Sequence, residues 1–183
     1  MLSILQYAKE LLQPALPEDG YAADFTMGNG HDTLFFSRAV PKGKVWAFDI
    51  QPAALEATRK LLEENGVGEN VQLILDSHSN LDRYIDTPLD AAMFNLGYLP
   101  WADKSVTTKR ETTLEAVEKA LARIKVGGVL VIVIYPGHEE GRLEGEALQA
   151  RLSQLDHKKW DVLLHRLIHV PTCPYILAAE RRK

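Results

Sequence analysis

The sequence has very little cysteine, since Cys173 is the only one among its 183 residues. Within one chain this excludes a disulfide framework and a zinc site built from cysteines. No apolar run approaches the roughly 20 residues of a membrane-spanning helix, so we expect no membrane partner. The first ten residues carry charge too early for a secretory signal peptide, and we expect a cytoplasmic protein.

The chain also lacks an overall basic character, because its formal net charge is −4. A nucleic acid would therefore have to bind through a local patch. One basic and aromatic cluster, in residues 101–110, is a candidate for holding phosphate and a base, although a solvated helix start would look the same. With 46% hydrophobic and 25% charged residues and no repeat or linker, we expect a single domain spanning residues 1–183.

Short apolar runs alternate with amphipathic stretches, which predicts an α/β fold. We expect strands over residues 21–25, 45–48, 71–75, 89–94, 129–135, 160–170 and 175–180. We expect helices over residues 2–12, 32–39, 53–64, 80–85, 108–124 and 140–155. The alternation implies a mostly parallel sheet with right-handed crossovers. Gly127 and Gly128 are predicted to form a turn, and the last two strands to form an antiparallel hairpin.

A glycine turn over residues 24–33 joins the first strand to the first crossover helix. Gly28 and Gly30 can take positive φ and allow a ligand to approach the backbone closely. Asp49 ends the second strand, about 20 residues later, the spacing at which a carboxylate binds a ribose hydroxyl. Together the turn and the acid predict a nucleoside-binding half-site.

Polar side chains follow each predicted strand at its carboxyl end, where open parallel sheets bind ligands. The candidates for holding a nucleoside cofactor are Gly28, Asn29, Gly30, Asp49, Gln51, Ser77 and His78. Asn29 is expected to meet the amino-acid or ribose part of the ligand. Asp49 is expected to accept hydrogen bonds from ribose hydroxyls, with Gln51 as a second contact. Ser77 and His78 lie where an adenine edge would be read, but His78 could instead serve in capping or packing, and Asp49 could cap the helix after it.

The catalytic candidates follow the fourth and fifth strands. The side-chain oxygen of Asn95 can accept a hydrogen bond from a target amine, and Tyr98 can stack on a flipped-out base. His138 can accept a proton near neutral pH. A structural turn with a core tyrosine, and a surface histidine, are the alternatives. The histidines show no helical zinc-ligand spacing, and we predict no metal.

Several motifs together resemble one small bacterial methyltransferase family, long labelled as rRNA methylases. They lie at residues 26–33, 48–51, 77–78, 95–100, 103–105 and 137–138. The resemblance spans about residues 24–140 and implies the class I methyltransferase fold. That fold is a doubly wound, mostly parallel, seven-stranded Rossmann-like sheet with a C-terminal antiparallel hairpin. Two departures stand out, because Phe25 replaces a small residue and Trp101-Ala102 replaces a Gly-Gly pair.

Members of that family methylate the amino group of 5-aminomethyl-2-thiouridine at the tRNA wobble position, giving 5-methylaminomethyl-2-thiouridine. The resemblance therefore implies S-adenosylmethionine as cofactor and the anticodon region of tRNA as partner. It leaves the oligomeric state open, a homodimer being one option. The alternatives are an rRNA or small-molecule methyltransferase of the same fold, a noncatalytic binding module, and an NAD-binding oxidoreductase. Thr33 stands where a dinucleotide fingerprint would place its third glycine, which disfavours the oxidoreductase.

Overall fold

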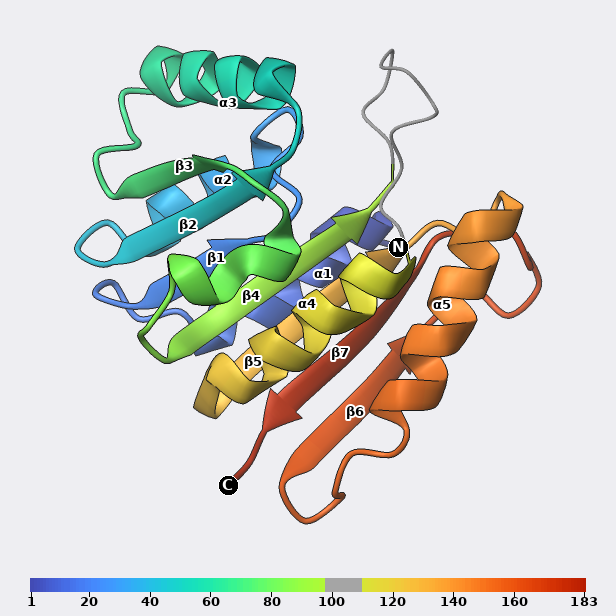
Figure 1. Cartoon of the computed structure of the whole chain (residues 1–183). Coiled ribbons are helices and arrows are strands. Elements are labelled where there is room, and N and C mark those ends of the chain that lie inside the picture. Colours follow the sequence, from blue (N-terminus) through green and yellow to red (C-terminus); the bar gives the residue numbers. More distant parts are fainter. Residues whose placement is uncertain (98–109) are drawn as a thin grey trace.

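The structure, a computed structural model, describes residues 1–97 and 110–183 (Figure 1). Its helices are α1 (Ile4–Leu12), η1 (Gln13–Ala15), α2 (His31–Ala39), α3 (Pro52–Glu64), η2 (His78–Arg83), α4 (Arg110–Arg123) and α5 (Glu139–Leu152). Its strands are β1 (Tyr21–Asp24), β2 (Lys44–Asp49), β3 (Val71–Leu75), β4 (Leu89–Leu96), β5 (Ile124–Ile134), β6 (Trp160–His165) and β7 (Tyr175–Arg181). In this part of the chain, no helix combines the length and the apolar character that crossing a membrane requires.

All seven strands form one sheet in the order β3-β2-β1-β4-β5-β7-β6. Strands β1 to β5 pair in parallel, whereas β7 runs antiparallel to both β5 and β6. The predicted fold, including the antiparallel C-terminal hairpin, is confirmed. Strand order reverses between β1 and β4, and in open α/β sheets ligands bind at such a point, beyond the carboxyl ends of the strands.

Helices cover both faces of the sheet (Figure 1). On one face, α1 and α2 bury Leu12 and Phe36 against the strands, and α3 packs alongside them through Ala54. On the other face, η2, α4 and α5 bury Leu81, Ala116 and other apolar side chains against the same sheet. Strand interiors covered on both faces are apolar, which explains why their sequences show unbroken hydrophobic runs.

Besides small shifts at helix ends, such as α5 ending at Leu152 and η2 spanning His78–Arg83, two predicted strand features differ in the structure. Residues 127–128 do not form a turn before the fifth strand, because β5 already begins at Ile124. Between the paired residues Leu89↔Ile124 and Ala91↔Val129 the register shifts, and Gly127 has a φ of 82°. A glycine with positive φ lets extra residues of one strand bulge without ending the pairing. The strand predicted over residues 160–170 is also shorter, since β6 ends at His165.

Candidate active site

The glycine turn lies directly after β1. Gly28 and Gly30 have φ values of 50° and 84°. A Cβ on Gly30 would lie 2.9 Å from Thr58 Cα, so α3 leaves no room for a side chain there. Helix α2 begins at His31 without a side-chain cap from Gly30. Its first backbone N–H groups are therefore suited to an anionic group of a ligand.

Asp49 connects the end of β2 to the glycine turn. Its Oδ2 accepts a hydrogen bond of 3.1 Å from Gly28 N–H, and its Oδ1 accepts one of 3.0 Å from Gln51 N–H. Gln51, and not Asp49, occupies the N-cap position of α3. A carboxylate oxygen has two lone pairs, so each Asp49 oxygen can accept one more hydrogen bond. The partly exposed carboxylate is thereby fixed in orientation and can accept further hydrogen bonds from a ligand that offers hydroxyl groups.

Asp24 is a second carboxyl group at the same edge and is fully buried. Its Oδ1 accepts from Thr26 N–H at 3.1 Å and its Oδ2 from the Thr33 hydroxyl at 2.6 Å. Burial raises the pKa of Asp24 to about 7, and the negative charges of Asp32 and Asp49 add to this effect. The hydrogen bonds from the two threonines act in the opposite direction. The site therefore contains an acid that titrates near neutral pH.

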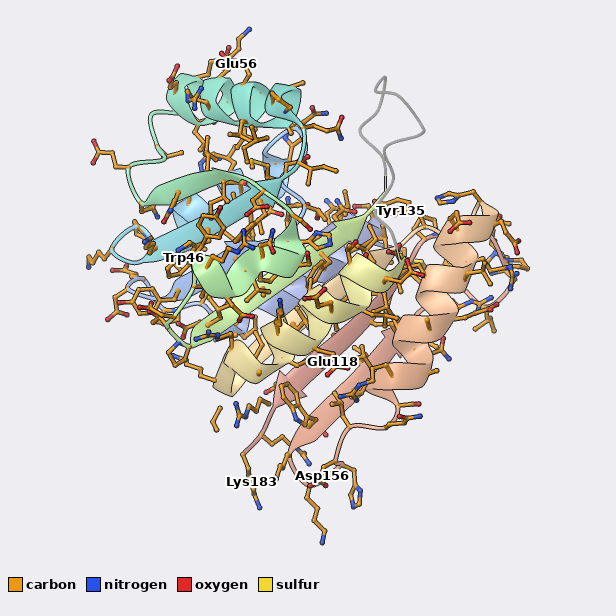
Figure 2. All side chains as sticks on the ribbon, in the orientation of Figure 1. Trp46, Glu56, Glu118, Tyr135, Asp156 and Lys183 are labelled. Carbon is orange, nitrogen blue, oxygen red and sulfur yellow. The ribbon has the colours of Figure 1, made fainter. Side chains whose placement is uncertain are left out.

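Asn95 lies at the carboxyl end of β4 and is held by residues of the β1–α2 segment. Its backbone N–H lies 2.7 Å from the Thr26 hydroxyl, and its side-chain Nδ2 donates to Asp32 Oδ2 at 3.1 Å. The ammonium of Lys9, from α1, lies 3.1 Å from Asp32 Oδ1. Tyr135 lies beside Asn95 at the end of β5, and Figure 2 labels it at the edge where β4 ends.

The pKa of Tyr135 is raised, first by burial and then by the charge of Asp32, while a hydrogen bond from Asn95 acts against both. The neighbouring Asp32 and Asn95 thus influence Tyr135 from the adjacent strand and helix. Because the phenol stays neutral at physiological pH, Tyr135 offers the site a hydroxyl group and no charge.

Ser77 and His78 follow β3, and both have structural partners. The Ser77 hydroxyl accepts from Ser79 N–H at 3.2 Å and caps η2. His78 Nδ1 lies 3.0 Å from the carbonyl oxygen of Phe25. The His78 ring packs edge-on against the Phe94 ring, with 5.5 Å between the two ring centroids. A carbonyl only accepts, so Nδ1 carries the hydrogen and Nε2 has a lone pair. Burial lowers the pKa of His78, and within residues 1–97 and 110–183 the buried Nε2 has no hydrogen-bond partner.

His138 precedes α5 and acts as its N-cap. Its Nδ1 accepts a hydrogen bond of 3.1 Å from Gly141 N–H. In the neutral ring the hydrogen is consequently on Nε2. A proton taken up by His138 would have to add at Nδ1 and would replace this cap.

Sequence reasoning placed most of these groups at one edge but missed three of their connections. Tyr98 and most of the predicted basic and aromatic cluster, residues 101–109, lie outside the described residues. The contribution of Lys9 from α1 was missed, as were the Asp32–Asn95 hydrogen bond and the role of Asp24. Asp32 had one available signal, since it stands in the first turn of the helix that follows the glycine turn, where the sequence predicts a ligand at the helix start. Lys9 had none, because its position depends on how α1 packs on the sheet.

Comparison with known proteins relates the chain to RNA-modifying enzymes. A family model described as “Putative rRNA methylase” matches residues 45–180. Among curated proteins, the tRNA (mnm5s2U34)-methyltransferase, chloroplastic, of Arabidopsis thaliana is 36% identical over 172 residues. This match covers 87% of the chain but only 62% of the relative, so the chain spans less than two thirds of that protein's length.

Solved structures agree over nearly the whole chain. A “putative rRNA-methylase” from Clostridium thermocellum has a TM-score of 0.95 at 37% identity, covering 99% of this chain and 98% of that one. A “putative methyltransferase” from Streptococcus mutans in complex with SAH has a TM-score of 0.90 at 38% identity, with 99% of each chain covered. SAH is S-adenosylhomocysteine, which S-adenosylmethionine becomes when it gives up its methyl group.

Proposed function

The chain belongs to this rRNA methylase family, and from that premise we propose that it is an S-adenosylmethionine-dependent methyltransferase that acts on 5-aminomethyl-2-thiouridine at the tRNA wobble position. The product is 5-methylaminomethyl-2-thiouridine. The proposal is carried by the 36% identity over 172 residues to a relative named for wobble-uridine methylation. Family membership speaks against the oxidoreductase and the noncatalytic binding module as alternatives.

We propose that the cofactor lies across the carboxyl edge of β1 to β3. Asp49 would accept hydrogen bonds from the ribose, and the uncapped start of α2 with Gly28, Asn29 and Gly30 would hold the carboxylate end. The backbone of Gln51 orients Asp49. The two hydrogen bonds to Asp49 leave a lone pair on each of its oxygens, and the ribose hydroxyls of such a ligand are donors, which supports this assignment.

The adenine end is assigned to Ser77 and His78. The buried Nε2 of His78 has a lone pair and no partner within the described part of the chain. Such an orphaned acceptor is unfavourable unless a ligand supplies the donor. The exocyclic amino group of adenine is a donor of the required type, and it would complete the hydrogen bonding of the ring.

Asn95 is assigned to the target amine. S-adenosylmethionine, when bound, supplies a methyl group on a positively charged sulfur that is a good leaving group. The side-chain oxygen of Asn95 would accept a hydrogen bond from the amine and direct its lone pair toward that methyl group for in-line displacement. Because sulfonium needs little activation, positioning and exclusion of water are the main contributions expected from the protein.

Tyr98 is assigned to stacking on the extruded base, and the cluster in residues 101–110 to the RNA backbone. Both assignments rest on residue type and sequence position alone, since residues 98–109 are outside the described range. His138 is assigned as the proton acceptor, with Nδ1 exchanging its hydrogen bond with Gly141 N–H for the proton. The alternative is an amine that binds already neutral, with water receiving the proton released after transfer.

The test is methyl transfer from labelled S-adenosylmethionine to tRNA whose wobble uridine carries the aminomethyl group. Nucleoside digestion should show loss of 5-aminomethyl-2-thiouridine and a matching gain of the methylaminomethyl form. The matched control is the same tRNA as an unmodified transcript, which has no amine at that position and should receive no label.

An rRNA substrate is the second candidate, because the family model carries that description. Label incorporated into rRNA, or into the unmodified transcript, with none on the aminomethyl nucleoside, would overturn the proposed substrate. The methyltransferase assignment itself would survive that result.

A further inference from the structure

Three side chains from three separate elements form a line that ends at the proposed acceptor of the target amine. Lys9 on α1 lies 3.1 Å from Asp32 Oδ1 on α2, and Asp32 Oδ2 accepts from Asn95 Nδ2 on β4 at 3.1 Å. The Asp32 side chain is only 8% exposed, so water competes little for its contact with Asn95, whereas the Lys9 side chain is 31% exposed. A charge-assisted hydrogen bond in such surroundings orients its partners strongly.

The chemistry of this contact determines which way the Asn95 carboxamide faces. A carboxylate only accepts, so Asn95 has to turn its Nδ2 toward Asp32. This contact uses the nitrogen of the carboxamide, and the oxygen Oδ1 is turned away from Asp32.

The main chain of Asn95 is fixed by the same segment. Its backbone N–H contacts the Thr26 hydroxyl at 2.7 Å, while its side chain contacts Asp32 a short distance further along the chain. Asn95 is therefore held at two points by residues between β1 and the first turn of α2. This is the segment that carries the glycine turn, so cofactor loop and amine acceptor share one support.

We propose that Asp32, held by Lys9, is a positioning residue that keeps the Asn95 carboxamide oxygen facing the target amine. The inference rests on the proposed function of Asn95. It also gives α1 a part in the chemistry, because Lys9 forms an ion pair with the second oxygen of Asp32. The competing explanation is that Asp32 only stabilises the start of α2, as an acid in the first turn of a helix does.

Steady-state kinetics on aminomethyl-bearing tRNA separate the two explanations. Asp32→Asn keeps the shape of the side chain but allows the amides at positions 32 and 95 to flip, so kcat should fall. Asp32→Ala removes the partner of Asn95 and should lower kcat by roughly tenfold or more. The KM for tRNA and the affinity for S-adenosylmethionine should stay within about threefold of wild type, since neither ligand is assigned to Asp32. Lys9→Met should give a smaller loss of kcat in the same direction.

Exchanging the partners supplies a rescue that a helix-stabilising role would not show. Asn95→Asp alone places two carboxylates 3.1 Å apart and should be nearly inactive. In the double variant D32N/N95D, the amide at position 32 donates to the carboxylate at position 95, whose other oxygen faces the amine. The double variant should exceed N95D in kcat. Asp82→Asn on η2, which removes surface ion pairs with Lys119 and Arg123, is the matched control and should leave kcat unchanged.

A second measurement needs no substrate. In the labelled full-length protein, the Asn95 side-chain amide should show one Nδ2–H resonance shifted by its carboxylate partner, and this shift should disappear in D32A. Thermal unfolding reports whether each variant folds, and D32N serves if D32A does not.

An unchanged amide resonance, or a wild-type kcat in folded D32A, would overturn the positioning role while leaving the substrate assignment intact. A wild-type enzyme that fails on the tRNA would overturn the substrate assignment. The amide resonance would then still decide the orientation of Asn95.

Discussion

Asp49 Oδ2 accepts a hydrogen bond of 3.1 Å from Gly28 N–H, which ties the end of β2 to the glycine turn after β1. The two residues are 21 positions apart, and their contact fixes the carboxylate before any ligand arrives. A preoriented acceptor loses less conformational freedom when it binds a hydroxyl than a mobile one does. The relationship therefore explains how two loops are held together at the site proposed for the ribose, and it leads to the first prediction.

Asp49→Asn should weaken binding of S-adenosylmethionine. The amide nitrogen of the asparagine cannot accept a hydrogen bond from a ribose hydroxyl. It would also face the N–H of either Gly28 or Gln51, and two donors cannot hydrogen-bond to each other. Loss of one charge-assisted hydrogen bond amounts to about 1.5–3 kcal/mol, roughly a tenfold to hundredfold rise in Kd. Titration calorimetry measures it. Asp86→Asn, on the loop before β4 at the opposite edge, should bind normally, and an equal loss there would count against the site.

Gly30→Ala should destabilise the protein more than Gly66→Ala. Both glycines have positive φ, 84° and 64°, and each alanine carries the left-handed penalty of about 1–2 kcal/mol. At position 30 the new Cβ would also lie 2.9 Å from Thr58 Cα, whereas position 66 has nothing within 4 Å. Chemical denaturation gives both free energies of unfolding. Equal decreases in the free energy of unfolding would show that the glycine turn accommodates a Cβ at position 30 without additional strain.

Asp24→Asn should stabilise the protein at pH 8 more than at pH 4. The folded-state pKa of Asp24, about 7, lies above its ordinary value of 3.8, so the native state binds a proton that the unfolded state has lost. Asp24 therefore destabilises the fold progressively as pH rises from about 4 to 7, and by a constant amount above that. Melting temperatures of both proteins over this range test it. If the difference in melting temperature between the two proteins did not change with pH, the pKa of Asp24 would not be raised in the folded state.

His138→Ser separates the capping role of His138 from its proposed proton transfer. His138→Ala removes the N-cap of α5 and should lower the free energy of unfolding by about 1 kcal/mol, and serine should restore most of it. Neither variant can take up a proton near neutral pH, so both should lose activity if His138 is the acceptor. Wild-type turnover in a fully stable H138S protein would leave His138 with the cap alone.

The fold could be predicted from the sequence because apolar periodicity alternated clearly between strands and helices. Helix α3 and strand β3 were placed within a residue or two for this reason. Residues 127–128 were misassigned because glycines signal a turn and a strand bulge equally well, and only the pairing of β5 with β4 distinguishes them. The end of β6 was likewise set by where β7 stops pairing with it.

The sequence alone determined which residues gather at the ligand edge. Parallel strands with right-handed crossovers bring their carboxyl ends together, so Gly28, Asp49 and Asn95 had to converge once the strands were assigned. Tertiary structure alone decided their partners. Helices α1 and α2 pack against the same face of the sheet, in which β4 is the central strand. This packing brings Lys9 and Asn95 to opposite sides of the Asp32 carboxylate. Hydrogen bonds form only within about 3 Å. Such distances result from the packing of whole elements, and no local pattern of residues encodes them.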